Sequence, residues 1–352
     1  MVKIGVLGAG SLGLGLAMLL HNNGHDVTVW SVFPDEINEL NATRENKKCP
    51  YVKEGQYIVN VGKGIEEESL KTLCEVTKEE IPQAVVAVLS GPSHAEEVGR
   101  GIPTTCVIGT ANKKDAEYLQ NMFMSNVFRV YISPDVLGIC IGGALKNVIA
   151  LAAGIADGLG YGDNTKAALI TRGIAEITRL GLAMGADFAT FSGLSGIGDL
   201  IVTCASMHSR NRRAGILIGK GYTTKEAMDE VQMVVEGVYA AKAAKKLAEK
   251  YNVEMPIVEQ VNQVLFDGKS PADIPGCKFL DLYSGSGAIG IEALSRGAAK
   301  AVLVENSKKA VECIKDNLTF TKLADKADVM EMDVLSAINR LKGKDVFSIV
   351  YM

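Results

Sequence analysis

Apolar residues follow two different periods along the 352-residue chain. Short apolar runs bounded by glycine or proline are typical of buried strands, whereas apolar positions three and four residues apart predict helices. The first third of the chain alternates between the two patterns. We expect helices over residues 11–23 and 65–76, and strands over residues 3–7, 26–30, 57–61, 84–89 and 104–108.

The pattern changes to helical spacing alone between Asp135 and about Gly268. A capping signal at residues 223–226 and breaks at glycines and Pro256 fit a set of packed helices. At residues 270–276 the helical spacing of apolar residues ends, and a new strand, glycine turn and helix begin at Lys278. The prediction is an α/β chain of three domains: a shortened Rossmann-type parallel sheet (1–134), an all-α domain (135–272) and a partial Rossmann-like fragment (273–352).

The stretch between the second and third predicted strands shows little periodicity of apolar and polar positions. A short helix is plausible beyond Pro34, but residues 41–50 are polar and patternless. A doubly wound sheet normally continues from its second strand through further strand and helix units. None is readable here, so the predicted sheet lacks an internal segment.

Charge and cysteine usage narrow the functional classes. There are 37 Lys and Arg residues against 41 Asp and Glu, and this formal charge of -4 gives no basic excess for nucleic acid. Seven scattered cysteines without metal-ligand spacing predict neither a zinc site nor a disulfide framework. The N-terminus leaves no room for a signal sequence, and the apolar stretches 136–145 and 147–156 are too short to cross a bilayer. We expect a soluble cytoplasmic protein without a metal.

A glycine turn follows the first predicted strand. Residues 8–13 read Gly-Ala-Gly-Ser-Leu-Gly and open a helix, so backbone amides at the helix N-terminus can meet a pyrophosphate. The alternative is a turn that serves only helix and strand packing. An acid at the end of the second strand would indicate NAD, but Trp30 is followed by Ser31, Val32 and Phe33. The choice between NAD and NADP therefore stays open.

Lys146 is the catalytic candidate because it lies in an otherwise apolar predicted helix. Desolvation lowers the pKa of an ammonium group toward the range useful for moving a proton to or from a substrate oxygen. The alternative is a surface lysine whose alkyl stem covers apolar neighbours.

Two polar segments suggest a substrate pocket. Gly91, Ser93 and Ala95 lie on the turn after a predicted strand, where backbone amides and a hydroxyl can line a pocket; the alternative is a simple Gly-Pro turn. Asp199 is followed by a polar run at residues 209–213 that contains three arginines, and a guanidinium fork suits a phosphate dianion. An exposed basic loop is the other reading of that run, and the lack of interleaved aromatics argues against nucleic acid.

Together these segments resemble the bacterial glycerol-3-phosphate dehydrogenase family over about three quarters of the chain. The segments that carry the resemblance are residues 8–13, 59–64, 90–95, 143–150 and 209–213. The resemblance implies reversible hydride transfer between NAD(P)H and dihydroxyacetone phosphate, which gives sn-glycerol 3-phosphate for glycerophospholipid synthesis. It also implies that Lys146 is the base in oxidation and the acid in reduction, and that the helical domain forms a homodimer.

The resemblance also assigns binding residues. The substrate set is Lys63, Gly91, Ser93, Lys146, Asp199, Ser209, Arg210 and Asn211. The cofactor set is Gly8, Gly10, Ser11, Leu12, Gly13, Lys63, Ala95, Arg210, Val234 and Glu236. The chain departs from the family in two ways: members carry a further segment after the second strand, with a strand that ends beside the cofactor, and Val32 stands where they usually have histidine or arginine.

A second glycine turn begins the C-terminal fragment. Residues 281–290 also follow a predicted strand, and alone they would suit a second dinucleotide. Together with the run 290–298 they resemble the rRNA guanine-N2 methyltransferase family, which implies S-adenosylmethionine as ligand of Asp281, Gly285, Gly287, Glu305 (ribose) and Asp333 (adenine). The catalytic turn of that family would follow the last residue, so we expect no methyl transfer. The alternatives are a non-functional fused fragment and a recombined, inactive chain.

Overall fold

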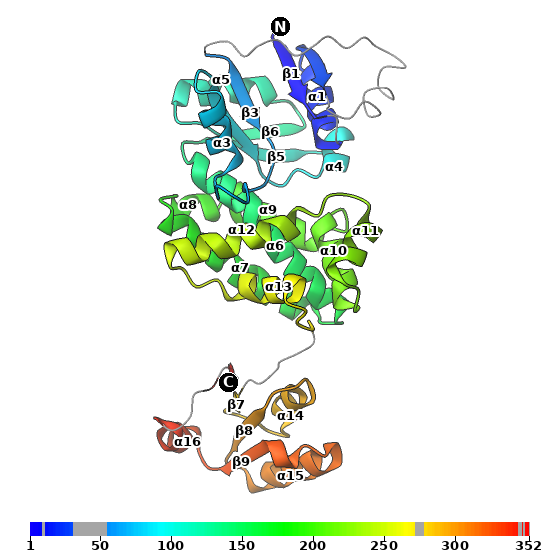
Figure 1. The fold of residues 1–352 in the computed structure, drawn as a ribbon, viewed down its shortest axis with the longest axis vertical. Helices are drawn as coiled ribbons and strands as arrows, with labels where there is room; N and C mark the ends of the chain where they lie inside the picture. The colour runs from blue at the N-terminus through cyan, green and yellow to red at the C-terminus, as the bar shows by residue number, and fades with distance from the viewer. Residues whose placement is uncertain (9–10, 31–54, 272–277, 344–346, 348, 352) are drawn as a thin grey trace. The chain divides into compact units, whose positions relative to one another are not determined.

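A computed structural model describes residues 1–8, 11–30, 55–271, 278–343, 347 and 349–351 (Figure 1). The chain forms two compact units, Met1–Lys269 and Ser270–Met352. Each unit has its own apolar core. The finer division into three domains stays a prediction.

The first half of the larger unit alternates strands and helices. Its elements are β1 (Lys3–Leu7), α1 (Ser11–Asn22), β2 (Asp26–Trp30), β3 (Tyr57–Asn60), α3 (Leu73–Glu80), β4 (Val85–Ser90), α4 (Ala95–Gly99), β5 (Thr104–Gly109), α5 (Lys113–Phe123) and β6 (Phe128–Ser133). Within the described residues the strands form two sheets, one of β1 and β2 and one in the order β3-β4-β5-β6. The pairs are parallel except β4–β5. The connection between those two strands holds only the five-residue helix α4, so the chain does not make a full crossover there.

Helix α1 holds the two sheets together. Its buried leucines, among them Leu16 and Leu20, share one core with Leu89 of β4 and Ile108 of β5. Gly15 lets α1 approach α4 closely, because a Cβ atom there would lie 3.3 Å from the backbone nitrogen of Gly99. The small sheet is thus fixed against the large one through a helix.

One predicted helix begins later than the apolar pattern indicated. The expected helix over residues 65–76 is wrong for its first two thirds, because α3 starts only at Leu73. Thr72 and Glu75 form a capping box that begins the helix, and Leu70 just before it has φ 60°. The sequence analysis also missed α5 and β6, which follow the last strand it predicted.

The second half of the larger unit is helical, as predicted. Its elements are α6 (Val136–Gly158), α7 (Asp163–Ala183), α8 (Phe188–Phe191), the π-helical turn η1 (Leu194–Gly198), α9 (Asp199–Ala205), α10 (Arg210–Gly219), α11 (Thr224–Val231), α12 (Glu236–Tyr251) and α13 (Pro256–Phe266). Helix α6 runs through the middle of this bundle (Figure 1). Asp135 starts it by accepting a 2.9 Å hydrogen bond from the backbone N–H of Gly138.

Helices α6 and α10 touch backbone to backbone. A Cβ atom on Gly154 would lie 2.2 Å from the carbonyl oxygen of Arg212, and one on Gly215 would lie 2.3 Å from that of Leu151. Gly158 and Gly219 make the same approach one turn further along. Glycine is therefore required at these positions for the observed helix packing.

The two apolar stretches around Lys146 are one continuous helix, not two short segments. By length and composition alone, α6 and the helical stretch Phe188–Ala205 could each cross a membrane. However, 89% of the apolar window in α6 is buried inside the protein, as in the core helix of a soluble protein. A core helix explains the apolar run without a bilayer.

The smaller unit is a partial α/β fold. Its elements are β7 (Lys278–Asp281), α14 (Ala288–Ser295), β8 (Lys300–Glu305), α15 (Lys308–Thr321), the 3-10 turn η2 (Ala324–Lys326), β9 (Ala327–Glu331), α16 (Val334–Leu341) and β10 (Ile349–Tyr351). The parallel strands have the order β10-β7-β8-β9. Side chains on the two faces of this sheet form separate apolar clusters, around Leu303 and around Val304.

Candidate active site

Lys146 occupies the middle of α6, where it is surrounded by core residues. Its exposed fraction is 6%, and its neighbours along the helix, Leu145, Val148 and Ile149, are fully buried. The side chain is therefore no surface lysine. Burial of an ammonium group needs a compensating charge.

Asp199 supplies that charge to two lysines at once. Lys146 Nζ lies 2.5 Å from Asp199 Oδ1, and Lys63 Nζ lies 2.7 Å from Asp199 Oδ2. Lys146 also donates a 2.7 Å hydrogen bond to Thr203 Oγ1. Asp199 and Thr203 are one turn apart on α9, so a single helix positions both partners of Lys146. The sequence analysis did not find Thr203, although its i, i+4 spacing from Asp199 places the two on one helix face.

The two ammonium groups respond differently to their shared carboxylate. Burial lowers the pKa of Lys146 to about 8, because the attraction of Asp199 only partly offsets desolvation and Lys63 repels it. Burial would also lower the pKa of Lys63, but Asp199 holds it above its ordinary value. Burial disfavours the Asp199 carboxylate, yet the two lysines keep its pKa below the usual range. Lys146 is thus the group of the three that exchanges a proton near neutral pH.

Lys63 reaches this carboxylate across the turn after β4. Its ammonium donates a 3.0 Å hydrogen bond to the carbonyl oxygen of Gly91, which also accepts one from Ser93 Oγ. Gly91 has φ 138° and packs on Cys106, where a side chain would be strained. Gly143 of α6 leaves room for Lys63, because a Cβ atom there would lie 3.4 Å from Lys63 Cγ.

The turn continues into α4, which begins at Ala95 with His94 as the residue before it. The His94 ring lies 5.9 Å from that of His208, which precedes the first residue of α10 by two positions. Burial, and then the charge of Lys146, lower the pKa of His94, which favours the neutral imidazole. The sequence analysis did not single out His94, because a lone histidine in a turn carries no spacing signal.

The polar run at residues 209–211 forms the N-terminus of α10. Ser209 Oγ caps the helix by accepting a 3.2 Å hydrogen bond from the backbone N–H of Arg212. Arg210 Nη2 lies 3.3 Å from Glu236 Oε1, and Asn211 Oδ1 accepts a 2.8 Å hydrogen bond from the backbone N–H of Gly237. Glu236 is therefore a partner of the arginine and no isolated surface acid.

Asn147 connects this second cluster to the lysine cluster. It follows Lys146 on α6, and its Nδ2 donates a 3.3 Å hydrogen bond to Glu236 Oε2. Arg212 points elsewhere: its guanidinium lies 2.7 Å from Asp157 Oδ2 and serves the packing of α10 on α6. Arg213 is exposed. Of the three arginines, only Arg210 joins the candidate site.

The first glycine turn is described only in part. Gly8 has φ 105°, and a Cβ atom on Gly13 would lie 2.3 Å from the Gly8 carbonyl oxygen, so the turn and helix pack as a dinucleotide turn requires. Leu12 is half-buried. Gly10 lies outside the described residues, as does the Ser11 side chain. Val234, before Glu236, is exposed.

In the smaller unit, Asp281 ends β7 with a buried carboxylate. Neither of its oxygens has a partner at hydrogen-bond geometry within the described residues, and burial raises its pKa, which the neighbouring backbone N–H groups of Gly290 and Tyr283 only partly offset. Gly285 and Gly287 both have positive φ, and Glu305 accepts a 3.0 Å hydrogen bond from the Gly285 N–H. Asp333 instead caps α16 by accepting a hydrogen bond from Ser336 N–H. Asp281, Gly285 and Glu305 thus surround one turn, whereas the Asp333 carboxylate is engaged as a cap.

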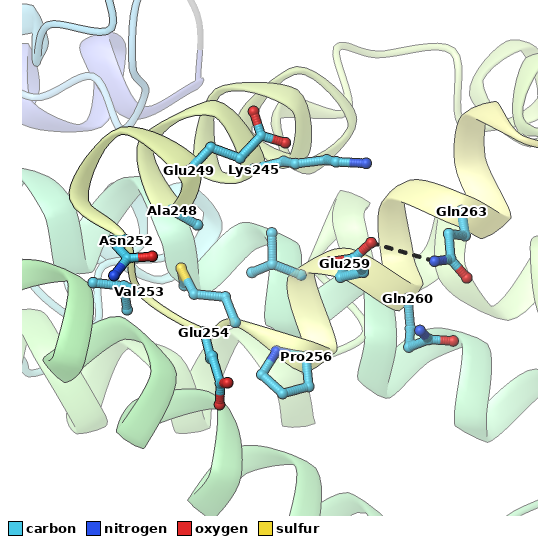
Figure 2. Close-up of a pocket in the computed structure, with 12 residues that line it drawn as sticks. Lys245, Ala248, Glu249, Asn252, Val253, Glu254, Pro256, Glu259, Gln260 and Gln263 are labelled. Atoms are coloured by element: carbon cyan, nitrogen blue, oxygen red, sulfur yellow. Dashed lines mark hydrogen bonds between the residues drawn. The ribbon is translucent and has the colours of Figure 1, made fainter. Parts of the chain in front are cut away.

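A surface cavity of about 610 Å³ lies between α12 and α13, lined by Lys245, Glu249, Glu254 and Glu259 among others (Figure 2). None of its lining residues belongs to the lysine cluster. Within the described parts of the chain, no group of three His, Cys, Asp or Glu side chains could hold a metal ion. The described cysteines are free.

Family models match the larger unit in two parts. The model "NAD-dependent glycerol-3-phosphate dehydrogenase C-terminus" matches residues 135–275, and the corresponding N-terminus model matches residues 3–50 and 48–116. The break in the second match falls where the sequence predicts a missing segment. A further model, "Conserved hypothetical protein 95", matches residues 235–352 and covers the smaller unit.

Two bacterial dehydrogenases match the chain over the length of the larger unit. Glycerol-3-phosphate dehydrogenase (NAD(P)+) of Fusobacterium nucleatum is 56% identical over 78% of this chain and 95% of its own, and that of Agathobacter rectalis is 55% identical over 76% and 93%. The first alignment is 318 residues long, which exceeds the number of residues in 78% of this 352-residue chain. The relative therefore carries residues that this chain lacks.

A solved structure gives the same result for the fold. The crystal structure of glycerol-3-phosphate dehydrogenase from Coxiella burnetii superposes with a TM-score of 0.71 at 33% identity, over 76% of this chain and 96% of that one. The sequence matches indicate the same family as the glycine turn, the helical bundle and the buried lysine cluster. Over its larger unit, the chain belongs to the NAD(P)-dependent glycerol-3-phosphate dehydrogenase family.

Proposed function

We propose that the chain transfers hydride reversibly between NAD(P)H and dihydroxyacetone phosphate, giving sn-glycerol 3-phosphate for phospholipid synthesis. The observation that carries this proposal is the buried cluster in which Asp199 joins Lys63 to Lys146. The relatives' name supports it. The bound nicotinamide supplies the hydride.

In this proposal Lys146 handles the proton of the substrate oxygen. With a pKa of about 8, its neutral amine accepts the hydroxyl proton during oxidation, and its ammonium returns a proton to that oxygen during reduction. Asp199 holds the amine in place and limits how far burial lowers its pKa. Lys63, which keeps its charge, stabilises negative charge that develops on the same oxygen.

The start of α10 binds the substrate phosphate in this proposal. Arg210 offers a guanidinium fork, and the Ser209 and Asn211 side chains and the helix N-terminus add donors. Asn147 and Glu236 fix the position of Arg210 relative to Lys146. Gly91 and Ser93 contribute the opposite wall, because they hold Lys63.

The residues fit a nicotinamide cofactor at the glycine turn. Gly8 has a positive φ and a Cβ atom there would meet nothing within 4 Å, while Gly13 lets α1 pack on the Gly8 carbonyl, as a pyrophosphate turn at the α1 N-terminus needs. Ala95 begins α4 and Glu236 begins α12, with Val234 two residues before it, and in this proposal these residues contact the rest of the cofactor. We leave NAD and NADP as alternatives, since the end of β2 carries no discriminating side chain among the described residues.

Steady-state kinetics with NADH and NADPH test this function. We expect NAD(P)H oxidation with dihydroxyacetone phosphate, and at least about tenfold less with dihydroxyacetone, which lacks the phosphate. Arg210→Gln should raise KM for the phosphorylated substrate at least about tenfold, whereas the matched change at exposed Arg213 should not. Equal effects of the two changes would refute the phosphate site, and a folded chain that binds cofactor but never oxidises it would refute the function.

We further propose that the larger unit forms a homodimer in the cytoplasm through its helical part. Exposed apolar side chains on that part, such as Phe188, Ile201 and Tyr239, support an interface. Light scattering on the purified chain would show twice the monomer mass. A monomer at micromolar concentration would contradict the proposal.

A second candidate function belongs to the smaller unit, which we propose binds S-adenosylmethionine. Its support is the buried, unpartnered Asp281 carboxylate beside the positive-φ glycines and Glu305. Titration calorimetry should detect binding that Asp281→Asn weakens by about tenfold or more. Failure of the unaltered chain to bind would remove this candidate without touching the dehydrogenase.

A further inference from the structure

Two buried cysteines from different elements share one small apolar cluster of the larger unit. Cys74 is the second residue of α3, and Cys140 lies in the first turns of α6. Their exposed fractions are 4% and 7%. Both belong to the cluster that also contains Val88, Val107 and Ile139, and the helices α3 and α6 contact each other. The two thiols are therefore neighbours in the fold, although they are far apart in sequence.

The two thiols also interact with each other directly. A hydrogen bond from the Cys140 thiol, with help from the Asn60 side chain, lowers the pKa of Cys74 against the opposing effect of burial. The same hydrogen bond, and then burial, raise the pKa of Cys140. The charge of Glu75 raises both pKa values to a lesser degree. Of the pair, Cys74 is thus the thiol that ionises first, and Cys140 keeps its proton.

The other described cysteines of the larger unit have a different environment. Cys106 and Cys204 are also buried and free, but they belong to other apolar clusters. Burial raises their pKa values to about 11 and 12. An easily ionised thiol with a second thiol beside it is the arrangement found in cysteines that respond to oxidants. Among these four cysteines, Cys74 and Cys140 have that arrangement.

We propose that Cys74 and Cys140 form a modification site, at which hydrogen peroxide oxidises the two thiols reversibly to a disulfide bond. Disulfides of proteins in a reducing compartment are usually transient in this way. Because both thiols are covered, the oxidant has to be small and has to enter when α3 opens locally. Helix α3 has eight residues, and Cys74 is its one buried residue, so few buried contacts oppose that opening.

The oxidation proceeds in two steps whose atoms and electrons balance. The Cys74 thiolate attacks one oxygen of the peroxide, the O–O bond breaks, and the leaving hydroxide takes up a proton to give water and a sulfenic acid. The Cys140 sulfur then attacks the Cys74 sulfur, the S–O bond breaks, and the leaving hydroxide takes the proton of the Cys140 thiol. Two thiols lose two electrons, the peroxide gains them, and two water molecules form.

The bond would fasten α3 to α6. Lys63 precedes α3 in the chain, and Lys146 follows Cys140 on α6, so the bond joins the elements that lead to the two lysines of the candidate site. A disulfide that closes a long loop stabilises the folded protein mainly by restricting the unfolded chain. We therefore expect oxidation to raise the midpoint of thermal unfolding by about 5 °C or more.

Mass spectrometry of the full chain tests the proposal. The reduced chain is treated with excess hydrogen peroxide, its remaining thiols are alkylated, and it is digested without a reductant. We expect one linked pair of peptides that contains Cys74 and Cys140 and that dithiothreitol separates. Calorimetry before and after oxidation measures the shift of the thermal midpoint.

Two variants separate the roles of the cysteines. Cys140→Ala removes the second thiol, so peroxide should leave a sulfenic acid at Cys74, which dimedone captures. Cys204→Ser changes a buried cysteine of another cluster and should still form the Cys74–Cys140 bond. The unaltered chain alone decides whether the bond forms if either variant does not fold.

Three outcomes would overturn the inference. Cys74 that stays reduced in the oxidised chain, or that links to another cysteine, would show that the pair is not the site. A bond that forms only in urea would show that α3 does not open in the folded protein. A lower thermal midpoint of the linked chain would refute the stabilising role and leave the modification site standing. None of these measurements needs cofactor or substrate, so their results are independent of the proposed dehydrogenase function.

Discussion

Helix α6 and strand β1 are both apolar segments that contain glycine, but the fold treats them differently. Residues Ile139 to Ile149 of α6 are buried without interruption, and even Lys146 among them has charged and polar partners. In β1, alternate residues are exposed and one backbone edge lacks a described partner. The difference teaches that an apolar run indicates that a segment favours burial. Whether the segment is in fact buried depends on which other elements pack against it.

As a consequence, the two sides of the candidate active site differ in how firmly the fold holds them. The proposed proton-handling side of the site is well ordered, because Lys63, Lys146, Asp199 and Thr203 hold one another through hydrogen bonds and Gly91 accepts a further one from Lys63. The cofactor side rests on a two-stranded sheet fixed by one helix. The following changes test this contrast, beginning with the largest expected effect.

Lys146→Met should lower kcat by about a hundredfold to ten thousandfold, because the substrate oxygen loses its proton donor and acceptor. Cofactor affinity, measured by fluorescence, should be unchanged. The matched change Lys225→Met, on the exposed face of α11, is the control. A loss of less than tenfold at Lys146 would show that another group carries the proton.

Asp199→Asn should lower the free energy of unfolding by about 3–5 kcal/mol, because two ammonium groups lose their buried counter-charge. Urea denaturation measures this. The control is Glu117→Gln, which breaks an exposed 3.7 Å pair with Lys113 and should cost less than about 1 kcal/mol. Similar values for the two changes would mean that the lysine cluster is hydrated in solution.

Leu145→Ala and Leu7→Ala compare the two regions directly. The first removes a fully buried side chain beside Lys146 and should cost about 2–5 kcal/mol. The second truncates an exposed side chain and should stay within about 0.5 kcal/mol. A large cost at Leu7 would show that β1 is covered in solution, and the contrast between the regions would disappear.

Gly215→Ala should cost about 1–3 kcal/mol, because its Cβ atom would lie 2.3 Å from the Leu151 carbonyl oxygen and force α10 away from α6. Gly162→Ala is the control, since a Cβ atom there meets nothing within 4 Å. The Gly215 variant should also raise KM for the phosphorylated substrate. An unchanged KM would separate helix packing from the position of Arg210.

The pH dependence should differ between the two reaction directions. Oxidation needs the neutral Lys146 amine, so kcat/KM should rise about tenfold per pH unit and level off above about pH 8. Reduction needs the ammonium and should fall above the same pH. Profiles with their midpoints near 10 would mean that burial does not lower the Lys146 pKa.

Much of this architecture follows from the sequence, for reasons visible in particular residues. The strand, glycine turn and helix at residues 3–22 were predicted because their apolar runs are short and end at Gly8 and Gly24. The environment of Lys146 followed from its apolar neighbours. Its counter-charge also lay among the predicted residues, but the contact between Lys63 and Asp199 joins residues far apart in sequence and could not be read from spacing.

The structural features that the sequence did not predict depend on tertiary contacts. The start of α3 is set by a capping box and not by the apolar pattern that suggested residue 65. Thr203 and Asn147 become site residues only because α9 and α12 fold back onto α6. The antiparallel β4–β5 pair has no local signal either, since it results from a short connection.

The backbone contact between α6 and α10 has a further consequence. Lys146 and Arg210 lie on these two helices, and the glycines at 154, 158, 215 and 219 bring the two main chains into direct contact. The distance between the backbones that carry the ammonium and guanidinium groups is therefore set by main-chain contact. Under the roles proposed for the two residues, this contact works as a molecular ruler for the number of bonds between the reacting oxygen and the phosphate.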